Sequence, residues 1–267
     1  PHGLDRRTVP ARDGRRVRGR DAVDRGRRVL SLGAGVQSST LLLMAVHGEL
    51  AVDRAIFADT QWEPRAVYRW LEYLMPIAER AGIPIDVVSA GNIRADALAG
   101  KTESWMPLHI VNLKGEAGLA KRQCSKNYKL VPIKRRIRQL IGRKKDATAT
   151  ATIGISWDEW QRQSTSGLKW MTNEYPLVDR RMTRGDCLRW LRAHGYPTPP
   201  KSSCIGCPYK RDDQWRDMRD HAPDEWADAV AFDAAMRYDR IDGKAYLHRS
   251  LMPLPIYLSH RLVERQA

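Results

Sequence analysis

The chain has 267 residues, a length typical of one large domain, and its 42% apolar residues are enough to build a hydrophobic core. Its longest unbroken apolar run, Leu41 to Val46, is far shorter than the roughly 20 residues that a membrane-spanning helix needs. We therefore expect no membrane span, no secretory signal and a cytoplasmic location.

The net charge of +15 comes from two stretches of the chain. Residues 1–28 hold ten Arg and four Asp, and residues 121–145 hold eleven Lys or Arg and no acid. The first stretch lacks hydrophobic periodicity and is predicted to be a flexible basic arm. Such localised positive charge favours polyanionic partners, whereas the arginine bias of a GC-rich genome is the alternative for the arm.

After the arm, short apolar strands alternate with amphipathic helices. This alternation predicts an α/β fold in which a parallel twisted sheet carries helices on both faces. Strands are predicted at 29–32, 54–58, 85–88 and 148–155, and helices at 38–50, 64–81, 127–141, 184–193, 211–220 and 223–238.

The composition changes after the fourth predicted strand, where Trp, Arg and Asp become frequent. A Pro-rich stretch then precedes a Cys-x-x-Cys motif. We therefore divide the chain into the arm 1–28, a nucleotide-binding α/β domain 29–180, and a helical cysteine-containing subdomain 181–267 packed on it.

A glycine-containing loop lies between the first strand and the first helix. Gly33 and Gly35 allow a tight turn, and the helix N-terminus offers free N–H groups and a positive dipole end to an anion. Ser38 and Ser39 can cap the helix and donate to a phosphate. A capped turn without a ligand is the alternative. No Gly-Lys-Ser/Thr follows, so the loop is not a Walker A motif.

Several stretches, in order from about residue 29 to 252, resemble motifs of the PP-loop ATP pyrophosphatase superfamily, in its phosphoadenosine phosphosulfate reductase-like branch. Ser31 to Ser39 resembles the Ser-x-Gly-x-x-x-x-Ser loop, and Phe57 to Glu63 resembles the strand-end Asp-Thr-Gly-x-Glu. Gly154 to Arg162 is similar to Gly-Ile-Arg-x-x-Glu-x-x-Arg. Tyr175-Pro176-Leu177 and Lys201 to Pro208 complete the series.

The resemblance implies an adenine nucleotide alpha hydrolase-like fold that lays ATP, with Mg²⁺, across the carboxyl ends of the strands. One departure concerns the loop, where Gln37 replaces the aspartate common in the family and removes a charge from the metal side. For Asp59, a strand-end Asx turn is the alternative. The implied nucleotide-binding residues are Ser31, Gly33, Gly35, Gln37, Ser38, Ser39, Asp59, Gly154, Glu159 and Arg162.

The four cysteines are Cys124, Cys187, Cys204 and Cys207. The Cys-x-x-Cys pair places two sulfurs within reach of one metal, and a Pro-rich loop precedes it instead of the strand of a thioredoxin-type dithiol. Cys124 opens the predicted helix 127–141. Cys187 shares a helix face with core residues and is either core or ligand.

The cysteine spacing resembles that of sulfur-transferring ATP pyrophosphatases of DNA phosphorothioation. This resemblance implies that all four cysteines are metal ligands, holding a [4Fe–4S] cluster. Soft thiolate ligands also suit zinc, which is the alternative.

Together these features predict an ATP-dependent sulfurtransferase that adenylates an acceptor oxygen and replaces it with sulfur. The acceptor is expected to be a nucleic acid or another anion, bound by Lys134, Arg135 and Arg138, with a sulfur donor such as a cysteine desulfurase. One alternative is a true phosphoadenosine phosphosulfate reductase, although the Glu-Cys-Gly-x-His motif of that family does not occur here. Another is a zinc-stapled nucleic-acid-binding protein without catalysis.

Overall fold

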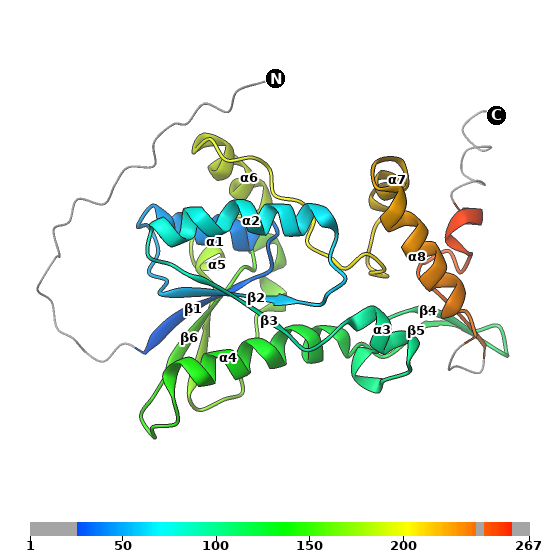
Figure 1. Cartoon of the computed structure of the whole chain (residues 1–267), viewed down its shortest axis with the longest axis horizontal. Helices are drawn as coiled ribbons and strands as arrows, with labels where there is room; N and C mark the ends of the chain where they lie inside the picture. Colours follow the sequence, from blue (N-terminus) through cyan, green and yellow to red (C-terminus); the bar gives the residue numbers. More distant parts are fainter. Residues whose placement is uncertain (1–25, 239–242, 258–267) are drawn as a thin grey trace, which may run out of the picture.

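A computed structural model describes residues 26–238 and 243–257 and contains a five-stranded parallel sheet (Figure 1). Its strand order is β3-β2-β1-β6-β7, and every neighbouring pair is parallel. The predicted α/β fold class is confirmed. The strands are β1 (Arg27–Leu32), β2 (Arg54–Asp59), β3 (Ile85–Ser89), β6 (Ala149–Ile153) and β7 (Met171–Glu174).

Helices cover both faces of this sheet because successive strand residues point to opposite sides. Leu30 and Leu32 belong to the core that includes α1 and α2, whereas Val29 joins the core beneath α4. Figure 1 shows α1 and α2 on one side of the sheet and α4 on the other. The helices are α1 (Val36–Val46), α2 (Arg65–Arg80), α4 (Val131–Ile141), α5 (Pro176–Asp179) and α6 (Arg184–Ala193).

The subdomain 181–267 was predicted to be helical, but part of it belongs to a second, smaller sheet. Three short antiparallel strands in the order β5-β4-β8 pack with α3, α7 and α8. The helix α6, assigned by the sequence to this subdomain, instead packs on α1. The elements are α3 (Ile93–Leu98), β4 (His109–Asn112), β5 (Ala117–Leu119), α7 (Asp212–His221), α8 (Pro223–Ala235) and β8 (Gly243–Tyr246).

The start of β1 and the start of the helix predicted at 127–141 also differ from the sequence-based expectation. Arg27 and Arg28, assigned to the flexible arm, begin β1, and residues 1–25 lie outside the described residues. The predicted helix 127–141 opens with a wide π-helical turn, Lys126–Leu130, before α4. In residues 26–238 and 243–257, no helix is long and apolar enough to cross a membrane.

Candidate nucleotide and thiol site

The loop between β1 and α1 is shaped by its serine and by one unusual backbone conformation. Gly33 N–H donates to Ser38 Oγ at 3.1 Å, and Ser38 Oγ lies 3.4 Å from the Gly35 carbonyl oxygen. Ala34 is buried and has a φ of 54°, a left-handed conformation that non-glycine residues rarely adopt. Because Ser39 N–H makes the first helical bond, to the Gly35 oxygen, the preceding N–H groups are available to an anion.

The loop lies where the strand order of the sheet reverses. β1 pairs with β2 on one side and with β6 on the other, and open α/β sheets bind ligands in the crevice at such a point. Gly154 follows β6 and touches the start of α1: a Cβ atom there would stand 2.8 Å from Ser38 N. The structure therefore brings Ser31, Gly33, Gly35, Ser38 and Gly154 together at one edge of the sheet.

Gln37 has a partner that explains its departure from the family motif. Its Nε2 lies 3.3 Å from Glu159 Oε2 and 3.4 Å from Ser156 Oγ. Glu159 also pairs with Arg162 at 2.9 Å. An amide can donate to Glu159, whereas an aspartate at this position would repel it. Gln37, Glu159 and Arg162 thus form one connected polar group beside the loop.

Asp59 stands at the carboxyl end of β2. Its Oδ1 accepts hydrogen bonds from Gln61 N–H at 2.7 Å and from Tyr68 O–H at 2.8 Å. The bond to Gln61 is the Asx turn given above as the alternative, and Gln61 itself has a φ of 57°. Burial, and then the hydrogen bond to Asp59, raise the pKa of Tyr68. Tyr68 therefore remains a proton donor that fixes the Asp59 carboxylate at the sheet edge.

The segment that carries Cys204 crosses directly over the loop Ser31–Ser39 between β1 and α1, which we call the phosphate loop. A Cβ atom on Gly35 would stand 2.5 Å from Ser202 Oγ, and one on Gly33 would stand 3.8 Å from it. Gly35 therefore leaves the room that this close approach needs, whereas a side chain at Gly33 would make only an ordinary contact. The loop Lys201–Pro208, which we call the thiol loop, and the phosphate loop form one site.

Cys204, a partly buried residue of the thiol loop, lies among polar side chains. Its Sγ is 3.4 Å from Thr60 Oγ1 and 3.7 Å from Glu63 Oε1. Burial, and then the negative charge of Glu63, raise the pKa of the Cys204 thiol to about 12. Cys207 N–H donates to the Cys204 carbonyl at 3.1 Å, which folds the two cysteines into one tight turn.

Two lysines and one glutamate surround this turn. The Glu63 side chain is 1% exposed and accepts from Lys129 Nζ at 2.9 Å, while its Oε2 has no hydrogen-bond partner in the described part of the chain. Burial alone would lower the pKa of Lys129, but the charge of Glu63, the hydrogen bond to it and the neighbouring Cys204 and Cys207 together raise it. Lys210 is buried, donates to Ser203 Oγ at 2.9 Å, and has its pKa lowered by burial. The turn thus lies in a cation-rich, largely dry environment.

The four cysteines do not all come together. Cys124 and Cys204 border the same hydrophobic cluster, but Cys187 is fully buried in the core between α1 and α6. Burial raises the pKa of Cys187 to about 11, so it behaves as a core thiol. Across residues 26–238 and 243–257, no three side chains of His, Cys, Asp or Glu are arranged as metal ligands. Cys204 and Cys207 thus offer two neighbouring thiols, but the described residues do not form a complete site for a cluster or for zinc.

Several other residues singled out in the sequence are engaged in internal contacts. Ser39 is buried and accepts from Trp70 Nε1 at 2.8 Å, so it serves the packing of α2 on α1. Lys134 Nζ donates to a backbone carbonyl at 3.0 Å, and the Arg138 guanidinium lies 5.4 Å from the centre of the Trp170 ring. Arg135 is exposed on α4.

Five further residues take part in the site without having been predicted: Ser202, Thr60, Glu63, Lys129 and Lys210. Ser202, Thr60 and Glu63 lie inside the stretches 57–63 and 201–208 that resemble known motifs. Their place in these motifs was the only sign in the sequence that they could belong to the site. No local pattern marks Lys129, because its contact with Glu63 joins residues 66 positions apart.

The fold and the site define an open parallel α/β protein in which a glycine-containing loop at a helix N-terminus and a thiol-bearing loop meet at the sheet's switch point. Neither the protein-family models nor the curated proteins contain a match to this chain. Among solved structures, the U34-tRNA thiolase NcsA from Methanococcus maripaludis with its [4Fe–4S] cluster is similar, with a TM-score of 0.41 and 14% sequence identity. The alignment covers 84% of this chain and 77% of that one.

Proposed function

We propose that this protein is an ATP-dependent sulfurtransferase of the ATP-pyrophosphatase type. The observation that supports the proposal is the close approach of Ser202 to Gly35, by which the loop that carries the Cys-x-x-Cys motif lies against the open N-terminus of α1. A site for adenylation alone has no need of two neighbouring thiols, and a thiol site alone has no need of an open helix N-terminus. Both features in one site favour activation by ATP followed by sulfur transfer.

In the first step, an acceptor oxygen attacks the α-phosphorus of ATP. A new P–O bond forms, the bond between the α-phosphorus and the bridging oxygen breaks, and pyrophosphate leaves. The N–H groups at the start of α1 and the Ser38 hydroxyl would hold the phosphates during this step. Arg162 adds positive charge near the loop, although its ion pair with Glu159 reduces that contribution.

In the second step, sulfur at the oxidation level of sulfide attacks the activated atom of the acceptor. A bond to sulfur forms as AMP leaves with the oxygen, so no oxidant or reductant is consumed. Lys129 and Lys210 supply positive charge where an anionic sulfur species would stand, next to Cys204 and Cys207. A sulfur donor such as a cysteine desulfurase is the partner that this step calls for.

Magnesium fits the carboxylates at the sheet edge. This ion is usually bound by one or two protein carboxylates together with substrate phosphates, and Asp59 and Glu159 are available for that role. Its charge would offset that of the pyrophosphate leaving group. The thiols do not complete a cluster site as they are arranged, so no step is assigned to a cluster.

The test is the identity of the products. With Mg²⁺, ATP and a nucleic-acid acceptor, we expect AMP and pyrophosphate in equal amounts, and sulfur on the acceptor once a sulfide source is added. ADP and inorganic phosphate would contradict the proposal. Adenosine bisphosphate and sulfite formed from the phosphosulfate nucleotide with thioredoxin would instead establish the reductase alternative.

A further inference from the structure

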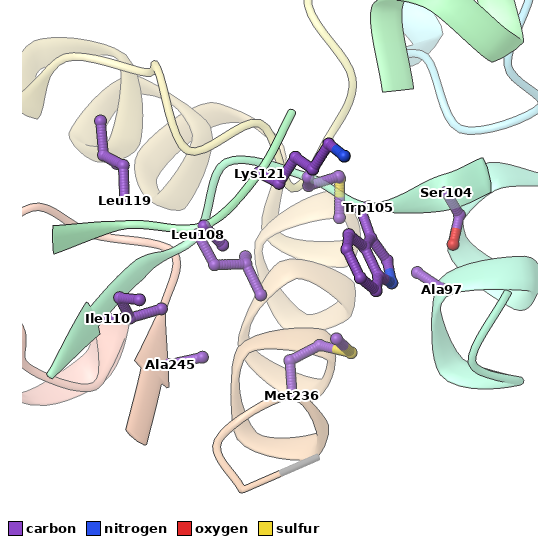
Figure 2. A pocket seen from close by; sticks show the side chains of 11 residues that line it. Ala97, Ser104, Trp105, Leu108, Ile110, Leu119, Lys121, Met236 and Ala245 are labelled. Atoms are coloured by element: carbon purple, nitrogen blue, oxygen red, sulfur yellow. The ribbon is translucent and has the colours of Figure 1, made fainter. Parts of the chain in front are cut away.

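An apolar pocket lies in the smaller sheet unit, outside the nucleotide and thiol site. Its volume is about 330 Å³, and its floor and walls come from β4, β8 and α8 and include Leu108, Ile110, Ala245 and Met236. Figure 2 shows these side chains converging beneath Trp105. A volume of this size is at the lower end of the range for small-ligand pockets.

The mouth of the pocket combines aromatic and cationic side chains. Trp105 is 40% exposed, and Figure 2 shows Lys121 beside it at the rim. The next residue, Arg122, lies over the ring of Tyr209 at 5.2 Å, and half of Tyr209 is exposed. Two exposed aromatic faces therefore stand next to two cations.

The cations at this mouth are not neutralised locally. Lys121, Arg122 and Lys126 are exposed, and none of them forms an ion pair with a carboxylate in residues 26–238 and 243–257. By contrast, Lys129 and Arg136 of the same basic segment are paired, with Glu63 and Asp86. Unpaired positive charge of Lys121 and Arg122 thus stands next to the pocket, which suits a polyanion.

We propose that the pocket mouth binds an unpaired nucleobase of a single-stranded nucleic acid, the base stacking on Trp105 and the neighbouring phosphates contacting Lys121 and Arg122. Aromatic faces among unpaired cations are the usual means of binding single strands without sequence readout. The polar edge of the base stays at the open rim, since the lining offers it few hydrogen bonds.

This inference deepens the proposed function, on which it rests in one respect: the bound strand is the acceptor. The backbone connects the pocket mouth to the thiol loop. The Trp105 carbonyl accepts from Gln123 N–H at 2.8 Å and from Cys124 N–H at 3.0 Å. From there the π-helical turn leads to Lys129, which contacts Glu63 beside Cys204. A strand held at Lys121 thus lies at the start of the segment that leads to the thiol loop.

The experiment measures binding of fluorescein-labelled oligothymidylate and oligouridylate to the full chain by anisotropy, without ATP. Trp105→Ala should weaken binding by about 5- to 150-fold, the range for loss of one stacked base. Trp105→Phe keeps a stacking face and should lose less, which separates stacking from misfolding. Trp160→Ala, which removes a tryptophan that is 50% exposed and lies elsewhere, is the matched control and should bind as the unmodified chain does.

The salt dependence tests the phosphate contacts. Replacing Lys121 and Arg122 with Gln should flatten the slope of log affinity against log salt by about 1.4, because each single-strand contact contributes about 0.7. Replacing Lys144 and Lys145, exposed at the other end of α4, should leave the slope unchanged.

Unchanged oligonucleotide affinity in Trp105→Ala would overturn the inference. So would Trp105-dependent binding of an acidic peptide with a central leucine when neither oligonucleotide binds, because the pocket would then belong to a protein partner. Trp105-dependent oligonucleotide binding by a chain that never forms AMP from ATP would support the pocket and refute the proposed function. The two failures are therefore distinguishable.

Discussion

The indole of Trp62 lies so close to Gly206 that a Cβ atom on the glycine would stand 2.1 Å from Cη2 of the ring. The Trp62 carbonyl accepts from Ile205 N–H at 2.9 Å, and its Nε1 donates to Asp228 at 2.6 Å. Trp62 comes two residues after Thr60 and one before Glu63. It therefore clamps the thiol loop onto the very segment that supplies the polar partners of Cys204.

Gly206→Ala should displace the thiol loop, because the new methyl group meets the Trp62 ring, which the hydrogen bond from Nε1 to Asp228 holds in place. We expect a loss of about 1–3 kcal/mol in the free energy of unfolding, measured by urea denaturation. Gly185→Ala in α6 is the control, since its Cβ would meet nothing nearer than 3.5 Å. Equal stability of the two variants would show that Trp62 does not clamp the loop.

Ser38→Ala should slow formation of AMP and pyrophosphate from ATP. One hydrogen bond to a charged group contributes about 1.5–3 kcal/mol, which corresponds to a roughly ten- to hundredfold loss in kcat/KM. Thr172→Ala, an exposed hydroxyl on β7, is the control. If Ser38→Ala turned over ATP at the normal rate, the loop after β1 would not be the phosphate site.

The Glu63–Lys129 pair should be energetically coupled. Lys129→Met leaves the buried Glu63 carboxylate unpaired and should cost about 1–3 kcal/mol of unfolding free energy, and Glu63→Gln in the same chain should recover part of it. The exposed pair Arg65–Asp224, at 3.1 Å, is the control and should show coupling below about 1 kcal/mol. Coupling no larger than in the control would mean that Glu63 is hydrated.

Cys187 should react as a core thiol and not as a metal ligand. It should resist iodoacetamide in the native protein, and Cys187→Ala should cost about 1–2 kcal/mol without changing the iron or zinc bound after anaerobic reconstitution, as measured by elemental analysis. Cys204→Ala, which removes one of the two neighbouring thiols, should lower the iron or zinc taken up in the same experiment. A loss of metal in Cys187→Ala would place that residue back among the ligands.

The raised pKa of Cys187 also sets a direction for stability against pH. Because burial favours the neutral thiol, its stabilising contribution is complete below about pH 9 and is lost as pH rises towards the folded-state pKa of about 11. Cys187→Ala should therefore lose less stability between pH 9 and 11 than the unmodified chain, in urea denaturation at each pH.

The sequence was informative wherever a local pattern decides the structure. The strands β1, β2, β3 and β6 and the loop after β1 follow from apolar runs and from glycines next to serines, and all were predicted. β4 and β8 could not be predicted in this way, because each has four residues and His109 pairs with Tyr246, 137 positions away. The smaller sheet is a product of long-range pairing.

The same distinction between local pattern and long-range packing applies to the residues of the site. The residues of the phosphate loop are contiguous and were found together. Which thiols meet is decided by packing: Cys187 is drawn into the core by Leu191 and the other apolar residues of α6, whereas Cys204 is held by Trp62 and Glu63. Helix periodicity left both roles open for Cys187, and only the contact of α6 with α1 decides between them.

The central claim is that ATP binds in the phosphate loop beneath the thiol loop. The most direct measurement is a crystal structure with α,β-methylene-ATP and Mg²⁺, a nucleotide that resists cleavage between its α- and β-phosphates. We predict the triphosphate against the N–H groups that follow Gly35, with Ser202 over it and the α-phosphate facing Cys204. A nucleotide bound elsewhere, or at the loop but with the thiol loop turned away from it, would contradict the account.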